Sequence, residues 1–227
     1  MPRSTTRYIS FELLQTRAPS SATVVTLMIA CNDMSLANQT LGHWKEKYQI
    51  AKENGASYEQ AWGACLYAIR AQIGHLYEGF KIIDRIASDA MLLRIIDQCD
   101  SKTQTSFDKL QTYGTGGLNQ ATLDRIAGTI RNNLGFHYDQ SGKLVGRAIG
   151  VLAQRQRSAS VTRASRGPDW YFDVASRVVD DVVCRQIWKI PPSADQLIEA
   201  DKIIGDIHDV FLAFMDFSGE FIWRYCK

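Results

Sequence analysis

The sequence has little of several features that would place it in a common class of protein. Its formal net charge is only +2, so any basic surface must be local rather than global. No apolar run approaches the ~20 residues that a membrane-spanning helix needs. Strict alternation of apolar and polar residues, which is typical of half-buried strands, is nearly absent. We therefore expect a helical protein with no membrane partner.

Cysteine is present, but its spacing matches no known paired motif. The five cysteines are isolated, and no CxxC spacing suggests zinc, so we expect buried free thiols in a reducing cytoplasm. An alternative rests on VVTLMIAC, residues 24–31, which could be a signal-peptide core ending in a lipoprotein-like cysteine. The preceding segment is long, contains Glu12 and Pro19, and is typical of a separate helix. This favours the cytoplasmic interpretation.

The usual catalytic and cofactor motifs are also missing. The glycines of residues 114–117 precede a helix, but no GxxxxGK[ST] motif follows them. There is no GxSxG, HExxH or ExxH motif, and His75 with Glu78 at i, i+3 is less than a di-metal bundle requires. We expect no metal site and no cofactor.

Helical periodicity is what the sequence has in abundance. Apolar residues recur at three- and four-residue spacing, most clearly in 64–98 and 194–224. The predicted breaks lie at Pro19, 53–57, 113–117, 157–166 and 190–192, and they delimit helices such as 6–17 and 22–49. Because no break resembles an interdomain linker, we expect one all-α domain over 1–227, a bundle of about seven helices.

Two local predictions accompany this fold. Ser193 with Gln196 three residues later indicates a capping box at the start of the last helix. Arg177, Asp181 and Arg185 stand at i, i+4 spacing, which predicts ordinary ion pairs along one helix face.

One stretch, TIRNNLGFHYDQSGK at residues 129–143, carries a dense group of polar side chains at the end of an apolar helix pattern. Five residues lie between Arg131 and His137, and on an unbroken helix these two would point roughly 120° apart. Gly135 between them is a poor helix residue, and Asn132 and Asn133 favour helix ends. A helix that ends here lets the histidine turn back toward the arginine, or lets two copies meet across a dimer axis.

This pattern resembles the signature of the HEPN superfamily (higher eukaryotes and prokaryotes nucleotide-binding domains). In that signature an arginine is followed by a polar residue and, a few residues later, by a histidine. Here the residues are Arg131, Asn132 and His137. The resemblance is sharp over about 120–140, and it extends to members from prokaryotic defence and toxin–antitoxin loci. It implies an HEPN-like helical fold, a homodimer, RNA as a partner and, by analogy with members from toxin–antitoxin loci, an antitoxin protein as a second partner.

The resemblance also implies metal-independent RNA cleavage. A histidine can take the proton of a ribose 2′-hydroxyl, and an arginine can stabilise the charge on the scissile phosphate. By this resemblance, Arg131 would bind the scissile phosphate and stabilise its charge, Asn132 would orient the reacting groups, and His137 would carry the proton. Tyr138 and Asp139 would have supporting roles. The expected product is a 2′,3′-cyclic phosphate.

A basic stretch follows the motif directly. Residues 140–168 contain no acidic residue, and they predict a track for an RNA backbone. Its basic residues are Lys143, Arg147, Arg155, Arg157, Arg163 and Arg166. The same pattern is also typical of a solvated face. The alternative function is accordingly a non-catalytic helical protein that binds RNA, nucleotide or another protein, in which RNNLGFH is a structural helix end.

Overall fold

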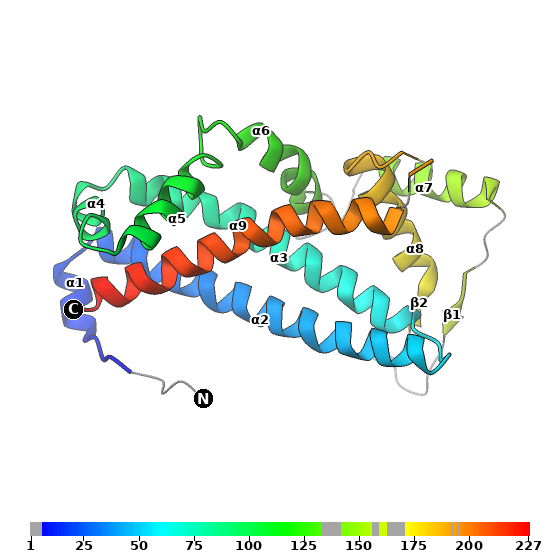
Figure 1. Ribbon diagram of the computed structural model, residues 1–227, viewed down its shortest axis with the longest axis horizontal. Coiled ribbons are helices and arrows are strands. Elements are labelled where there is room, and N and C mark those ends of the chain that lie inside the picture. The colour runs from blue at the N-terminus through cyan, green and yellow to red at the C-terminus, as the bar shows by residue number, and fades with distance from the viewer. Residues whose placement is uncertain (1–5, 133–141, 156–158, 163–170, 192, 195) are drawn as a thin grey trace. The chain divides into compact units, whose positions relative to one another are not determined.

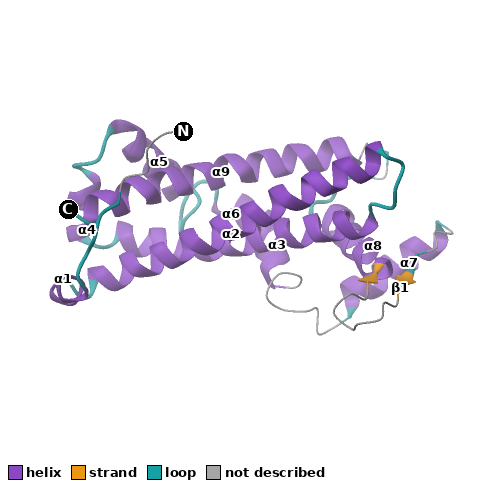
Figure 2. Cartoon of the chain, turned by 90° about the horizontal axis from the view of Figure 1, so that it is seen from below, coloured by secondary structure: helices purple, strands orange, loops and turns teal. Residues whose placement is uncertain are grey.

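A computed structural model describes residues 6–132, 142–155, 159–162, 171–191, 193–194 and 196–227 of the chain. These residues form helices joined by turns and loops, with a single pairing of two very short strands, and Figures 1 and 2 show the elements. The elements are α1 (Phe11–Thr16), α2 (Ser20–Glu53), α3 (Glu59–Ala87), α4 (Ala90–Ile96), α5 (Ser101–Gln111), α6 (Gln120–Leu123), the π-helix η1 (Asp124–Gly128), α7 (Lys143–Gln154), β1 (Val161–Thr162), β2 (Tyr171–Phe172), α8 (Asp173–Asp181), the π-helix η4 (Val182–Ile187) and α9 (Gln196–Tyr225).

The all-α prediction is confirmed, whereas the predicted number of about seven helices is not. Nine α-helices are found within the described residues. One cause is that the periodic stretch 64–98 is divided between α3 and α4. The Asp89 carboxylate accepts hydrogen bonds from the backbone N–H groups of Met91 and Leu92, at 2.9 and 3.2 Å, and so caps a new helix.

Other boundaries follow the sequence more closely. α2 begins directly after Pro19 and ends at Glu53, so the predicted break at 53–57 is confirmed. The loop predicted around 113–117 is confirmed as well. α9 begins only at Gln196, three residues after the predicted cap Ser193, which lies in a turn.

The chain groups into two compact units, each assembled from separate stretches of sequence. Unit 1 comprises residues 1–33, 76–122 and 206–227, and unit 2 comprises 34–75 and 123–205. The single domain over 1–227 stays a prediction.

The core of unit 1 is aromatic. Phe214, Phe217 and Phe221 lie one helical turn apart on α9 and are completely buried. The Phe217 ring lies 5.0 Å from the ring of Phe107 on α5 and 5.2 Å from that of Phe221, between ring centroids. Tilted and stacked ring pairs at this spacing contribute beyond their buried area.

Basic side chains of the N-terminal segment donate hydrogen bonds to the last carbonyl groups of α9 in unit 1. Arg17 donates to the backbone oxygen of Tyr225 at 2.8 Å, and Arg7 donates to that of Trp223 at 2.5 Å. The last carbonyls of a helix have no partner within the helix, so these arginines supply one. The Arg7 guanidinium also lies 3.7 Å from the centre of the Trp223 ring.

Unit 2 has a mainly aliphatic core to which α8 and η4 contribute Val178, Val182, Val183 and Ile187. α7 packs against α8 and η4, and Gln186 donates to the backbone oxygen of Leu144 at 2.9 Å. β1 pairs antiparallel with β2, which leads directly into α8 (Figure 2). The stretch 157–166, predicted as a loop, therefore contains a short strand at Val161–Thr162.

None of the helices within the described ranges contains a stretch long and apolar enough to cross a membrane.

Candidate functional site

Arg131 and Asn132 are the last described residues of a helical stretch that includes η1. Ile130 is completely buried, Arg131 is half-buried and Asn132 is exposed, so the helix is anchored on one side and open on the other. The Arg131 Nη1 atom donates to the Asn132 Oδ1 atom at 2.8 Å. π-helical turns are rare and occur often at functional sites, and both η1 and residues 131–132 have this geometry.

The other half of the motif lies outside the described residues. This applies to His137, the predicted proton carrier, and to Tyr138 and Asp139. The predicted convergence of Arg131 and His137 therefore stays a prediction.

The predicted RNA-binding residues divide into three groups. Lys143 and Arg147 are exposed, one turn apart on α7. Arg155 follows the last turn of α7, and its guanidinium lies 4.0 Å from the Asp181 carboxylate. Arg157, Arg163 and Arg166 lie outside the described residues.

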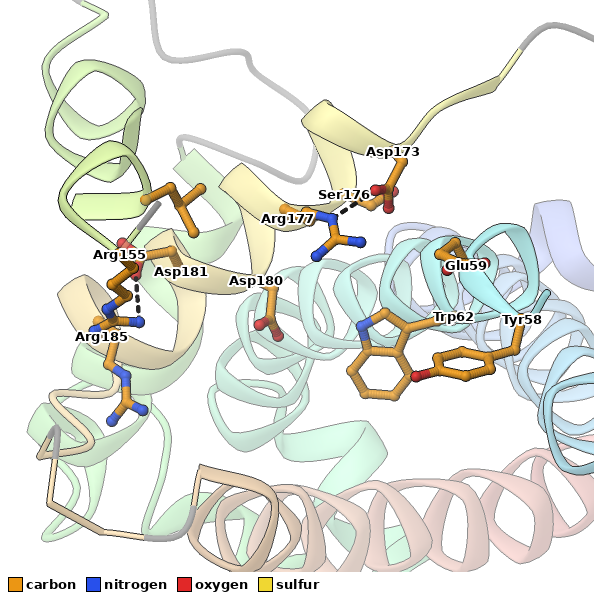
Figure 3. A pocket seen from close by; sticks show the side chains of 11 residues that line it. Tyr58, Glu59, Trp62, Arg155, Asp173, Ser176, Arg177, Asp180, Asp181 and Arg185 are labelled. Atoms are coloured by element: carbon orange, nitrogen blue, oxygen red, sulfur yellow. Dashed lines mark hydrogen bonds and ion pairs between the residues drawn. The ribbon is translucent and has the colours of Figure 1, made fainter. Parts of the chain in front are cut away.

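A polar pocket with a cavity volume of about 260 Å³ lies within unit 2, beside α8 (Figure 3). Tyr58, Glu59 and Trp62, from the start of α3, form one part of its wall. Its charged lining residues from the other elements are Arg155, Asp173, Arg177, Asp180, Asp181 and Arg185. Four carboxylates and three guanidinium groups therefore share this space.

Arg177 is tied to Asp173, not to Asp181 as the spacing predicted. The Arg177 Nε atom donates to the Asp173 carboxylate at 2.5 Å. This bond raises the pKa of the Arg177 guanidinium, and the charge of Glu59 adds to the effect. The pKa of Glu59 is lowered, first by a hydrogen bond from the Ser57 hydroxyl at 2.6 Å and further by the charge of Arg177.

Arg185 also departs from the predicted row of ion pairs. It donates to the backbone oxygens of Ile190 and Pro191, at 2.9 and 2.6 Å. The chain turns after η4, and this turn presents carbonyl groups to the guanidinium. The predicted Asp181–Arg185 pair is therefore wrong: within the described residues, the ion pair of Asp181 is with Arg155.

A smaller and mainly apolar cavity of about 30 Å³ adjoins this site, since Trp62 and Asp180 line both spaces. Its other walls include Ile130 and Trp188. Ile130 directly precedes Arg131, so the packing behind the polar pocket includes the residue before the arginine of the predicted motif.

The described residues show no group of three or more histidine, cysteine or acidic side chains that could hold a metal ion. His43 and His208 are exposed and lie beside aromatic rings, at 5.6 Å from Trp44 and 6.1 Å from Phe211 between ring centroids.

The five cysteines are free thiols, which confirms that part of the sequence interpretation, and Cys65, Cys99 and Cys184 are buried. Burial raises the pKa of the Cys65 and Cys99 thiols. A raised pKa keeps a thiol protonated at neutral pH, which disfavours it as a nucleophile.

The polar pocket was not anticipated from the sequence. The one available signal was Tyr58 and Trp62 at i, i+4 just after the predicted break at 53–57, a pattern that is more often part of a core. Nothing in the sequence indicates that these rings lie in one pocket with the carboxylates of α8, more than one hundred positions later.

Comparison of the chain with protein-family models, with curated proteins and with solved structures gives no match in any of the three.

Proposed function

We propose that this protein is a metal-independent endoribonuclease of the HEPN type, with a role in toxin–antitoxin or defence systems. Arg131 binds the scissile phosphate, Asn132 orients Arg131, and His137 carries the proton. The observation that supports this proposal most is the hydrogen bond from Arg131 Nη1 to Asn132 Oδ1, at 2.8 Å. A polar neighbour that holds one edge of the guanidinium restricts its rotation, so the group is oriented before a phosphate binds.

The reaction needs only groups of these types. The His137 imidazole accepts the proton of the ribose 2′-hydroxyl, and the 2′-oxygen attacks the adjacent phosphorus. The bond to the 5′-oxygen breaks, and this oxygen receives a proton from an imidazolium. The products are a 2′,3′-cyclic phosphate and a free 5′-hydroxyl. Arg131 stabilises the negative charge that accumulates on the phosphoryl oxygens.

A homodimer fits this scheme, because the resemblance implies that two copies of Arg131 and His137 line one cleft. Lys143 and Arg147 follow the motif closely in the sequence, and both are exposed on α7. We propose that an RNA strand bound at the motif also contacts these two residues. Their positive charges would hold the phosphate backbone without reading its bases.

The proposal is tested by incubating purified protein with total RNA and with tRNA in the presence of EDTA. The parent should cleave, and Arg131→Ala and His137→Ala should each remove cleavage while circular dichroism stays unchanged. Arg125→Ala is the matched control, because Arg125 is an exposed arginine six residues before Arg131 and should leave cleavage intact. Equal cleavage by the parent and by both motif variants would refute the assignment.

One observation favours the alternative, a non-catalytic helical binding protein. Arg155, one of the predicted RNA-binding residues, lines a pocket of unit 2 and pairs there with Asp181. Its charge is therefore partly neutralised within the protein. If RNNLGFH is likewise only a structural helix end, no cleavage occurs. His137→Ala should then cost about 1–3 kcal/mol of stability through a lost buried hydrogen bond.

A further inference from the structure

The polar pocket of unit 2 plays no part in the proposed ribonuclease reaction, and Arg131 does not line it. Its cavity of about 260 Å³ is close to the lower end of the ~300–1,000 Å³ range that small-molecule sites occupy. Figure 3 shows Asp180 and Asp181 of α8 on one side, with Glu59, Trp62 and Tyr58 at the start of α3 on the other.

The guanidinium groups of the pocket are already engaged by the protein. Arg177 donates to Asp173 at 2.5 Å, and Arg185 donates to two backbone oxygens. Arg155 is the loosest of the three, because its closest approach to the Asp181 carboxylate is 4.0 Å, at the limit of an ion pair. A bound anion would have to draw these groups from their partners while it faced four carboxylates.

Besides the Arg185 Nε atom, which is buried without a hydrogen-bond partner among the described residues, one lining group remains incompletely satisfied, the Asp181 carboxylate. Its side chain is only 4% exposed, and its Oδ2 atom is buried without a hydrogen-bond partner among the described residues. A buried carboxylate oxygen without a donor is costly, so this position favours a ligand that brings N–H groups and positive charge.

The aromatic wall fits the same kind of ligand. Trp62 and Tyr58, whose rings also pack against Tyr48, line the pocket. Aromatic faces attract cations through their quadrupole and cover aliphatic carbon well. Glu59, whose pKa is lowered and which is therefore ionised at neutral pH, adds negative charge at this end of the pocket.

We propose that this pocket binds a small organic cation, an aliphatic amine or guanidine. Its charged head donates to the Asp181 carboxylate, and its aliphatic chain lies against Trp62 and Tyr58. A second amino group at the far end of the ligand would lie near Glu59. This site is independent of the proposed ribonuclease chemistry, and either can hold without the other.

Isothermal titration calorimetry of the full chain at low ionic strength tests the proposal, with agmatine and putrescine as the probes and inorganic phosphate as the anionic comparison. Saturable binding of at least one amine at one site per chain is expected. Asp181→Asn should weaken that binding about tenfold or more, because it replaces a charge-assisted hydrogen bond by a neutral one. Asp108→Asn, a change at an exposed carboxylate of α5, should leave it unaltered.

Arg155→Gln decides the sign of the ligand charge. It removes the cation that competes for Asp181, so amine binding should become tighter, whereas an anionic ligand would bind more weakly. Trp62→Leu provides a second check if Asp181→Asn does not fold, and it should also weaken amine binding. The proposal fails if neither amine binds saturably, if no pocket variant alters amine binding, or if phosphate binds in place of the amines and weakens in Arg155→Gln.

Discussion

The two units of this chain use their charged side chains in opposite ways. In unit 1 the interior contains a cluster of phenylalanine rings. Arg7 and Arg17 lie at a helix end, where they donate hydrogen bonds to backbone carbonyl oxygens. In unit 2 carboxylates and guanidinium groups line a pocket, and the buried Asp181 keeps an oxygen without a partner among the described residues. A core of packed aromatic rings stabilises the fold, whereas charged side chains around a cavity are typical of a binding site.

The largest effect is expected from a change in the aromatic core. Phe217→Ala should lower the free energy of unfolding by about 3–5 kcal/mol, because it removes a fully buried ring between Phe107 and Phe221 and leaves a cavity. Urea unfolding followed by circular dichroism measures this. Leu212→Ala, a change at a side chain 46% exposed on the same helix, should cost far less. Equal losses for the two variants would mean that the rings do not form the core of unit 1.

A smaller loss is expected from the charged interior of unit 2. Arg177→Met should destabilise the protein by about 2 kcal/mol, since Asp173 is only 4% exposed and would lose its charged donor. The apolar stem is preserved in this variant, so packing alone does not account for a loss. Arg125→Met, at an exposed position of unit 2, is the control and should change stability by less than about 0.5 kcal/mol. A silent Arg177→Met would show that the Asp173–Arg177 pair contributes nothing.

The cap of α4 in unit 1 should contribute less and should depend on pH. Asp89→Ala should cost about 1 kcal/mol at neutral pH, because the carboxylate caps two backbone N–H groups. The pKa of Asp89 is lowered below its ordinary value of 3.8, chiefly by the hydrogen bond from Ser20. Its contribution is therefore complete above about pH 4 and is lost as the pH falls below 3.8 and through the lowered pKa. Unfolding at pH 7 and at pH 3 should show the difference between parent and variant shrinking, and a constant difference would contradict this cap.

The smallest effect distinguishes the basic surfaces of the two units. Lys143→Ala and Arg147→Ala should each weaken RNA binding modestly at any sequence and reduce the salt dependence of log K by about one unit. Lys102→Ala, at an exposed lysine of unit 1 that pairs with Asp216, should leave RNA binding as it is. Filter binding over a series of salt concentrations measures both. An equal effect of the unit 1 variant would remove any special role for α7.

The helices of both units were predictable from periodicity, and the chemistry of their ends was predictable only in part. The division at Asp89 was missed because apolar spacing continues across it, although an aspartate that can cap a helix is visible in the sequence. The Arg177–Asp181–Arg185 row was wrong because tertiary partners, Asp173 and the carbonyls after η4, compete with i, i+4 neighbours. The pocket depends on residues 58–62 lying near Arg155 and residues 173–185, and no local pattern encodes such a long-range contact.

The most direct test of the proposed function is the chemistry of the RNA ends. The parent protein, incubated with tRNA in EDTA, should produce fragments that carry a 2′,3′-cyclic phosphate and a 5′-hydroxyl, as read by mass spectrometry, and Arg131→Ala should produce none. Intact tRNA and total RNA in every reaction, or ends of another kind that persist in Arg131→Ala, would contradict the assignment of Arg131, Asn132 and His137 to an RNA phosphodiester.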